Sequence, residues 1–410
     1  MASGNGSTMK RPVPPSAFSM RSPSATARRS IFSYGVAASY IAKDRPYDPS
    51  THVFHFNPYN NRLQQSSVAA QKKRLSAPRQ QLKQKKQQRP ESGQDAFFVS
   101  RVGETGTVAL AVADGVGGWM ESGVDPADFS HGLCEYMAAA AYEHGKTVGT
   151  DKQQQQQQQQ QTPPPLSARR LMEIGYQAVR HDRAIPAGGS TAIVGLLSPD
   201  GELEVANLGD SGYIQLRLNA VHTCSEPQTH AFNTPYQLSM IPPNILARMA
   251  AFGGAQLSDE PRDAEVLRLD LRHGDVLVFA SDGVWDNLFN QDILQLVSRA
   301  MLATGAWEAQ GRDAGAPVAV APAPVLKKLV DTGFTTTSNN VVTLQSLIAT
   351  QITGAAKAAS VNTKLDGPFA KEVKRYYPQE TWHGGKVDDI CVVVAVVVEE
   401  PADAPVKSKL

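Results

Sequence analysis

Carboxylate side chains at turns beside apolar runs are the residues of this chain that could carry out chemistry. Four of them flank runs typical of β-strands, and a fifth lies in a turn between two such runs: Asp95, Asp114, Asp282, Asp388 and Asp210. Carboxylates that converge on one site repel one another unless a cation neutralises them. Oxygen ligands without histidine or cysteine select Mg2+ or Mn2+. A single Asp-Gly pair indicates only a hairpin turn, so the metal-site hypothesis depends on the whole set.

Strands and helices must bring these carboxylates together, and the apolar pattern predicts them. The run at 391–398 is continuous and is typical of a central strand buried on both faces. Strand-rich blocks interrupted by paired helices favour an α/β sandwich, with two packed antiparallel β-sheets flanked by helices on both outer faces (α-β-β-α). We expect strands at 96–102, 108–113, 191–197, 203–207, 213–218, 266–269, 276–280 and 391–398, and helices at 126–142, 168–181, 291–302 and 342–358.

Six stretches of the chain resemble motifs of the type 2C (PPM) family of metal-dependent protein phosphatases. They follow one another in the family's order and cover residues 93–398. Two details are similar to the mitochondrial branch of that family, namely Gly-Val-Gly-Gly-Trp at 115–119 and the His-x-Phe-Asn-x-Pro-Tyr-Gln-Leu element at 230–238. The six stretches are GQDAFFVS, LAVADGVGGW, AGGSTAIVGLL, VANLGDSGYIQLR, VLVFASDGVWDNL and KVDDICVVVAVV.

The resemblance implies a protein serine/threonine phosphatase. In that family a water bridging two divalent metal ions attacks the phosphorus, and no phosphoenzyme forms. The cofactors implied are two Mg2+ or Mn2+ ions, with room for a weaker third ion. The resemblance assigns catalysis to Asp114, Asp282 and Asp388. It also assigns ligands to the metal ions. Asp114 would bridge the first and second ions, and Asp282 and Asp388 would complete the first. The Gly115 carbonyl would bind the second ion, Asp95 would support it through water, and Asp210 with Asp282 would hold the third.

The chain departs from the family pattern at three points. Many members have an acid where Gln94 stands, so the second ion is expected to bind more weakly. Many members also have a histidine where Val116 stands, which leaves the proton donor unassigned. The phosphate-binding arginine cannot be placed, although Arg89 lies at about the right distance, so substrate-binding residues remain unknown. His230 is interpreted as a structural residue, and Asp389 and 189–191 as residues that shape the site.

Charge is distributed unevenly along the chain. Residues 1–90 carry 16 Lys and Arg against two acids, and the rest carries 24 against 37. An acidic catalytic body disfavours nucleic acid, because a phosphate backbone needs basic neighbours. This weighs against a nuclease. Another two-metal enzyme, such as a small-molecule phosphoesterase, is a further alternative. The remaining alternative is a catalytically weak pseudophosphatase that docks phosphoproteins, which Gln94 and the missing histidine would support.

The two ends of the chain have the composition of targeting segments. Residues 1–43 are rich in Ser and Arg without acids, which predicts an organelle transit segment with a weakly amphipathic helix at 28–40; a merely disordered N-terminus is the alternative. We expect a basic, partly disordered region at 44–90, with His52 and His55 outside the catalytic domain. That domain is predicted at 91–400, with low-complexity loops at 146–166 and 305–325, followed by a flexible tail at 401–410.

The last three residues, Ser408, Lys409 and Leu410, match a peroxisome address that an import receptor reads. Together with the transit segment they predict a protein divided between the mitochondrial matrix and the peroxisome.

No apolar run reaches the roughly 20 residues that cross a bilayer, and three scattered cysteines disfavour disulfides and zinc. Expected partners are phosphoprotein substrates and the peroxisomal import receptor, without nucleic acid or a membrane span, and the chain is expected to be a monomer.

Overall fold

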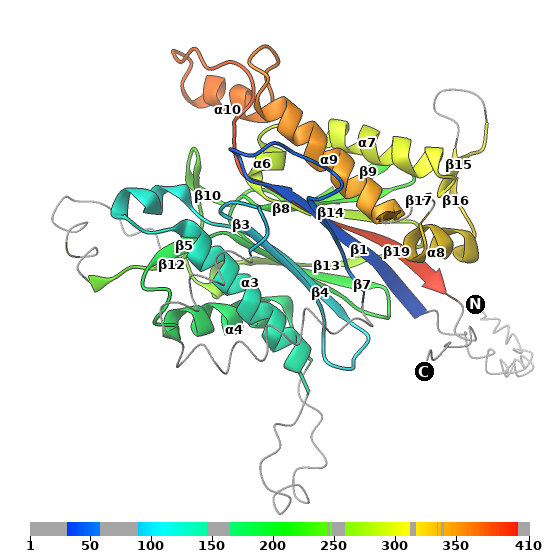
Figure 1. Cartoon of the computed structure of the whole chain (residues 1–410), viewed down its shortest axis with the longest axis horizontal. Coiled ribbons are helices and arrows are strands. Elements are labelled where there is room, and N and C mark those ends of the chain that lie inside the picture. Colours follow the sequence, from blue (N-terminus) through cyan, green and yellow to red (C-terminus); the bar gives the residue numbers. More distant parts are fainter. Residues whose placement is uncertain are drawn as a thin grey trace, which may run out of the picture.

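Two antiparallel β-sheets form the centre of the computed structural model, and helices cover both outer faces (Figure 1). The structure describes residues 31–57, 89–145, 165–243, 247, 259–311, 317–333, 335–337 and 340–400. The first sheet has the strand order β2-β1-β19-β14-β8-β9, and the second sheet has the order β13-β7-β6-β4-β3. This α-β-β-α arrangement confirms the fold class predicted from the sequence.

The chain passes back and forth between the two sheets, and consecutive strands often belong to the same sheet. The first sheet contains β1 (Ile31–Ile41), β2 (Val53–His55), β8 (Gly212–Arg217), β9 (Ala220–Cys224), β14 (Val276–Ala280) and β19 (Ile390–Glu400). The second sheet contains β3 (Asp95–Arg101), β4 (Val108–Asp114), β6 (Ala192–Leu197), β7 (Glu202–Leu208) and β13 (Glu265–Asp270). Smaller pairs are β5 (Gly188–Ser190) with β12 (Leu238–Met240), β10 (Thr229–Ala231) with β11 (Thr234–Pro235), β15 (Trp307–Ala309) with β16 (Val318–Val320), and β17 (Thr335–Thr337) with β18 (Asn340–Val342).

Helices lie outside each sheet and beside one end of the sandwich. The second sheet is covered by α3 (Pro126–Glu143) and α4 (Ala168–His181), and the first sheet by α7 (Asn290–Ala303), α8 (Ala323–Asp331) and α9 (Leu344–Ser360). The remaining helical elements are η1 (Gly117–Ser122), η2 (Pro261–Asp263), α6 (Asp282–Trp285) and α10 (Pro368–Tyr376). The eight strands and four helices predicted between residues 96 and 398 are confirmed to within two residues at each end.

Side chains of β19 fill both faces of the first sheet, as the continuous apolar run predicts. Val392 and Val394 belong to the core beneath the helices, whereas Val393 and Ala395 belong to the core between the two sheets. All four are fully buried. Side chains that alternate along a strand point to opposite faces, so the buried part of β19, residues 390–398, is apolar at every position.

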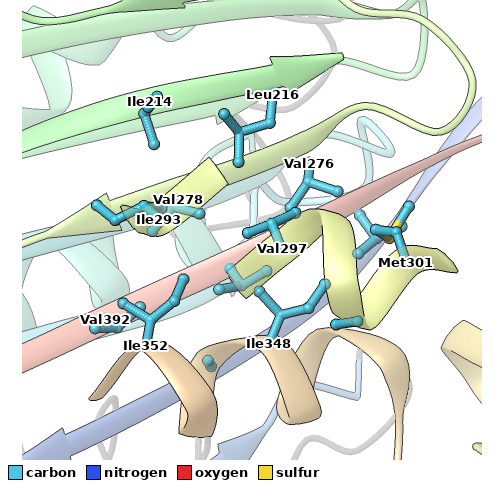
Figure 2. Packing of buried hydrophobic residues seen from close by; sticks show 14 of the residues in the cluster. Ile214, Leu216, Val276, Val278, Ile293, Val297, Met301, Ile348, Ile352 and Val392 are labelled. Atoms are coloured by element: carbon cyan, nitrogen blue, oxygen red, sulfur yellow. The ribbon is translucent and has the colours of Figure 1, made fainter. Parts of the chain in front are cut away.

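The outer face of the first sheet packs against α7 and α9 (Figure 2). Apolar side chains recur at helical spacing on both helices and lie against those of β8, β14 and β19. On the helices they are Ile293, Val297, Met301, Ile348 and Ile352. This layer supports the strands whose ends carry the acids described below.

The outer face of the second sheet packs against α3 and α4. Phe129, Leu133 and Met137 recur at intervals of four residues on α3 and are fully buried. Asp125 caps this helix by accepting a hydrogen bond from the amide of Ala127 at 3.2 Å. The start of α3 is thereby held near the ends of β3 and β4, where two of the acids lie.

The first strand corrects two predictions about the N-terminal part. Ile31–Ile41 is not the predicted helix over 28–40 but β1, which pairs with β19 along all eleven of its residues. Its side chains at Val36, Ala38 and Ile41 are buried in the two cores. The predicted boundaries at 43 and 91 are therefore wrong, because the folded domain already includes β1 and β2. Residues 1–30 and 58–88 lie outside the described residues.

His52 and His55 were also expected outside the domain, and this is wrong. His52 is buried and lies within hydrogen-bonding distance of the Asp48 carbonyl at 2.9 Å, and His55 ends β2. Neither lies in the acidic centre, since both are part of the edge of the first sheet formed by β1 and β2. Their interpretation as non-ligands remains a prediction.

The stretch predicted as a low-complexity loop at 305–325 contains a hairpin, so that prediction is wrong in part. β15 pairs with β16, and Trp307 is 1% exposed and donates a hydrogen bond to the Gly274 carbonyl at 3.1 Å. Burial of one large aromatic side chain orders a segment whose composition alone indicates a loop. Residues 312–316, most of the loop at 146–166 and the Ser-Lys-Leu tail lie outside the described residues. Among those that are described, no helix has the length and apolar character to cross a bilayer.

Candidate metal centre

Five carboxylates from both sheets meet at one end of the sandwich. Asp95 opens β3 and Asp114 closes β4, and the two are register partners in the second sheet. Asp282 follows β14 and Asp388 precedes β19, and these are neighbouring antiparallel strands of the first sheet. Asp210 lies in the turn from β7 of the second sheet to β8 of the first sheet. Antiparallel pairing thus brings residues from distant parts of the sequence to the same end.

A hydrogen bond joins the two sheets at this point. The hydroxyl of Ser281 donates to Oδ2 of Asp95 at 2.6 Å and accepts from the amide of Cys391 at 3.0 Å. Ser281 precedes Asp282 directly, so the bond sets the distance between the acids of the first and second sheets. A charge-assisted bond of this length is a strong one.

The carboxylates lie close enough to change one another's pKa. Burial raises the pKa of Asp114 well above its ordinary value, and the charges of the other four acids raise it further. The pKa of Asp95 is raised well above its ordinary value by burial and then by Asp389. The pKa of Asp388 is raised by burial and by Asp282. Such repulsion is removed when cations bind.

The pKa of Asp210 is raised in the same way, and one of its oxygens has no hydrogen-bond partner among the described residues. Burial raises the pKa of Asp210 well above its ordinary value, followed by the charge of Asp282. Among the described residues, buried Oδ1 of Asp210 and buried Oδ1 of Asp95 accept no hydrogen bond. A buried carboxylate oxygen without a donor is costly and is suited to a hard cation.

The donor set therefore fits divalent cations of the Mg2+ or Mn2+ type. It contains only oxygen atoms, and neighbouring acids raise the pKa values of Asp95, Asp114 and Asp210. Within the described ranges, however, no three acidic, histidine or cysteine side chains are arranged as a ready metal cage. Two of the acids, Asp282 and Asp388, are turned instead toward a lysine.

That lysine, Lys386, was missed by the sequence analysis, as was Asp286. Nζ of Lys386 lies 2.6 Å from Oδ2 of Asp282, 2.7 Å from Oδ2 of Asp286 and 3.2 Å from Oδ2 of Asp388. Burial raises the pKa of Asp282, but the charge and hydrogen bond of Lys386 outweigh it, so that the pKa is lowered. The available signals were the four-residue interval between Asp282 and Asp286 and the position of Lys386 two residues before Asp388.

Gly115 lies where a side chain cannot fit. Its amide donates to the Gln94 carbonyl at 3.1 Å, and a Cβ atom would lie 2.8 Å from the carbonyl oxygen of Pro126. The chain can therefore turn directly beside Asp114 and leave the peptide of Gly115 next to the acids. The role predicted for its carbonyl as a ligand remains a prediction.

Hydrogen bonds hold the backbone of Asp114 on the side away from the acids. Oγ of Ser190 donates to the Asp114 carbonyl at 2.8 Å, and Oγ1 of Thr191 accepts from the Asp114 amide at 3.1 Å. Thr191 also shares a hydrogen bond of 2.8 Å with Ser211 next to Asp210. These contacts agree with a supporting function of this segment.

Four other residues considered from the sequence have partners outside the acidic centre. Arg89 is paired with Asp128 on α3 at 2.8 Å, so it is engaged away from the acids. His230 lies 3.0 Å from Asp259 and stacks on Tyr236, as expected of a structural residue. The side-chain amide of Gln94 lies 3.3 Å from the sulfur of Met120, and the amide of Val116 donates to the Gly189 carbonyl at 3.0 Å.

Comparisons with known proteins agree with the sequence motifs. A sequence model described as Protein phosphatase 2C matches residues 84–313. The Protein phosphatase PTC7 homolog of Xenopus laevis is 31% identical over 311 residues, which are 75% of this chain and 82% of that protein. The mitochondrial Protein phosphatase 2C homolog 7 of Saccharomyces cerevisiae is 33% identical over 205 residues, which are 50% of this chain and 56% of that protein.

Among solved structures, the photosystem II phosphatase PBCP is similar with a TM-score of 0.49 and 26% identity, covering 74% of this chain and 91% of that one. The family match spans more than half of the chain and includes Asp95, Asp114, Asp210 and Asp282. The similarity to the PTC7 homologs extends over three quarters of it. The resemblance predicted from the motifs is confirmed, and the chain belongs to the protein phosphatase 2C family.

Proposed function

We propose that this chain is a metal-dependent protein phosphatase that hydrolyses phosphoserine and phosphothreonine. The observation that carries the proposal is the group of five acids at one end of the sandwich, Asp95, Asp114, Asp210, Asp282 and Asp388, whose mutual repulsion calls for bound cations. Membership of the protein phosphatase 2C family supports the same reaction. Mg2+ and Mn2+ are the cations whose preferred ligands match this set.

Asp114 would bridge two ions, Asp282 and Asp388 would complete the first, and the Gly115 carbonyl and Asp95 would serve the second. Bound divalent ions would supply an acidified water as the nucleophile and would neutralise the charge of the phosphoryl group. Ser281 orients Asp95 through its 2.6 Å hydrogen bond, which opposes the rise in the pKa of Asp95 caused by burial. The segment with Ser190 and Thr191 holds the peptide of Asp114 in place, so the carboxylate does not need to reorganise when it receives a cation.

The test is hydrolysis of a phosphothreonine peptide by the full chain over a range of Mn2+ and Mg2+ concentrations. Asp114→Asn should lower kcat at least ~100-fold, a rise of about 2.7 kcal/mol in the barrier. The exposed Glu380 offers a control, Glu380→Gln, which removes one charge away from the acids and should leave the rate unchanged. Metal-independent hydrolysis, or equal rates for wild type and Asp114→Asn, would exclude the proposal.

The alternative is a pseudophosphatase that docks phosphoproteins, and Gln94 is the feature that favours it. Two measurements separate it from an enzyme. Binding of Mn2+ without turnover, together with retention of a phosphopeptide by Asp114→Asn, would support docking. Turnover of nucleic acid or of small phosphate esters in preference to a phosphopeptide would instead support another two-metal phosphoesterase.

For localisation we propose the mitochondrial matrix, with a second population in the peroxisome. The composition of residues 1–30 and the terminal Ser408-Lys409-Leu410 support it, and one relative is named as mitochondrial. The test uses fluorescent fusions of the intact chain, of a chain that starts at Arg29 and of a chain that lacks the last three residues. If all three distribute alike, the proposal fails. Size-exclusion chromatography with light scattering checks the expected monomer.

A further inference from the structure

The ammonium group of Lys386 lies inside the acidic centre, and its side chain is 15% exposed. Three carboxylates surround it, those of Asp282, Asp286 and Asp388, at 2.6, 2.7 and 3.2 Å. A fourth oxygen, Oδ1 of Asn233, lies 3.3 Å away. An ammonium group has three hydrogens to donate, so this set satisfies it fully.

The surrounding residues hold Lys386 in this position. The side chain of Asn287, 4% exposed, binds its peptide on both sides: Oδ1 accepts from the Lys386 amide at 3.0 Å and Nδ2 donates to its carbonyl at 2.9 Å. The ring of Phe369 on α10 lies 5.2 Å from Nζ, within the range of a cation–π interaction. Asn233 reaches Nζ from the hairpin of β10 and β11, where its φ is +51°. Lys386 is therefore fixed from three directions.

The carboxylates around Lys386 adjoin Asp114, because Asp282 interacts with both Lys386 and Asp114. Asp282 and Asp286 lie one helical turn apart on and just after α6. Asp210 approaches from the β7–β8 turn, where the charges of Asp282 and Asp286 raise its pKa after burial and that of Lys386 lowers it. Its Oδ1 is buried and has no hydrogen-bond partner among the described residues. Asp210 thus lies close enough to Asp282 and Asp286 for their charges to act on it.

We propose that the Lys386 ammonium occupies the position of the third divalent ion, so that this chain binds two metal ions where Asp210, Asp282 and Asp286 would otherwise hold a third. This inference rests on the proposed function. One oxygen of Asp282 and one of Asp286 are used by Nζ at hydrogen-bonding distance. A divalent ion bound to the same oxygens would lie within about 4 Å of the ammonium, where the two like charges repel each other.

Counting bound Mn2+ by equilibrium dialysis of the full chain, with free Mn2+ read by electron paramagnetic resonance, tests the inference. Wild type should bind two ions even at millimolar Mn2+, and Lys386→Met should bind three. Lys386→Arg keeps the charge and should bind two. The exposed Lys364 provides a control, Lys364→Met, which makes the same change in net charge and should also bind two. Lys386→Met combined with Asp286→Asn should return to two.

The same number of ions for wild type and Lys386→Met would overturn the inference, as would three ions in wild type. If Lys386→Met is too unstable to purify without metal, its Tm is followed against Mn2+ in the same buffer. The Tm should then rise with Mn2+ more steeply than that of wild type, and parallel curves would count against the inference. If wild type hydrolyses the phosphopeptide with Mn2+ but Lys386→Met binds the same number of ions as wild type, only the inference about Lys386 fails. If wild type binds no ion, the proposed function itself fails.

Discussion

Oδ1 of Asp389 accepts a hydrogen bond of 2.7 Å from the backbone amide of Lys43, which lies two residues after the end of β1. The other oxygen accepts from the amide of Gln94 at 2.9 Å. One carboxylate beside the candidate ligand Asp388 therefore ties the end of β1 to the loop that carries Asp95. The segment that contains β1 and Lys43 is a structural support of the acidic centre, in contrast to the predicted transit segment over 1–43.

A chain that starts at Asp44 should not fold. It lacks β1, so the edge of β19 loses its partner and the buried sites of Val36, Ala38 and Ile41 are left empty. Each large buried apolar side chain contributes about 1.5–3 kcal/mol, so the loss approaches the ~5–15 kcal/mol stability of a typical domain. Thermal melting by circular dichroism checks this. A chain that starts at Arg29 is the control and should melt like the full chain; equal Tm values for the two truncations would refute the prediction.

Asp389→Asn should destabilise the protein by about 1.5–3 kcal/mol, the contribution of hydrogen bonds to a charged group. Both oxygens of Asp389 face backbone N–H donors, and the amide group of asparagine would place a donor against one of them. Chemical denaturation without metal measures the change. Asp44→Asn, at an exposed position nearby, serves as the control and should have no effect. The neighbouring Gly93→Ala should be at least as harmful, because its φ is +68° and a Cβ would clash with Oδ1 of Asp389.

The metal-free protein should lose stability as the pH rises from about 4 to about 7. The pKa values of Asp95 and Asp114 are raised by burial, and that of Asp286 is raised by burial to about 7, from an ordinary value of 3.8. In this window the folded chain holds protons that the unfolded chain has released, so raising the pH favours unfolding. The lowered pKa of Asp282 acts only below this window. The Tm in EDTA at pH 5 and pH 7.5 measures the effect, and Mn2+ should abolish it.

Asp114→Asn should raise the metal-free Tm at pH 7.5 while it removes activity. The substitution removes one charge from a group of acids that repel one another. The repulsion is evident because four neighbouring acids raise the pKa of Asp114. A gain of about 1 kcal/mol corresponds to ~2–4 °C in a domain of this size. With saturating Mn2+ the order should invert, because wild type gains more from the ions. A lower Tm of the variant in EDTA would show that the charges of the acids do not strain the fold.

Gln94→Glu should strengthen the binding of Mn2+. Gln94 follows Gly93 directly before Asp95, where an acid would add a charge to the centre. One added unit charge at 4 Å from a divalent ion is worth about 2 kcal/mol in water, or roughly thirtyfold in affinity. Isothermal titration calorimetry measures it, and Gln177→Glu on the exposed face of α4 is the control for a charge added elsewhere. An unchanged dissociation constant would mean that the amide at this position is not the cause of weak binding.

The locally ordered elements could be predicted from the sequence with good accuracy. The strand that ends at Asp114 and the strand that begins after Asp388 are apolar at each position, and α3 and α4 have apolar residues at helical spacing. Such patterns depend on residues a few positions apart. The same locality explains the failure at Ile31–Ile41, where Ser, Gly and Ala dilute the pattern and the strand exists because β19 offers it an edge.

The sequence by itself determined which residues could bind a cation and that a sandwich of two sheets would carry them. Strand-end carboxylates such as Asp95 and Asp114 are recognisable because the strands beside them are. Only the tertiary structure decided that β1 belongs to the first sheet and that Lys386 enters the acidic centre between Asp282 and Asp286. The reason is physical: strand pairing and the fields of buried charges act between residues that are close in space, whatever their separation along the chain.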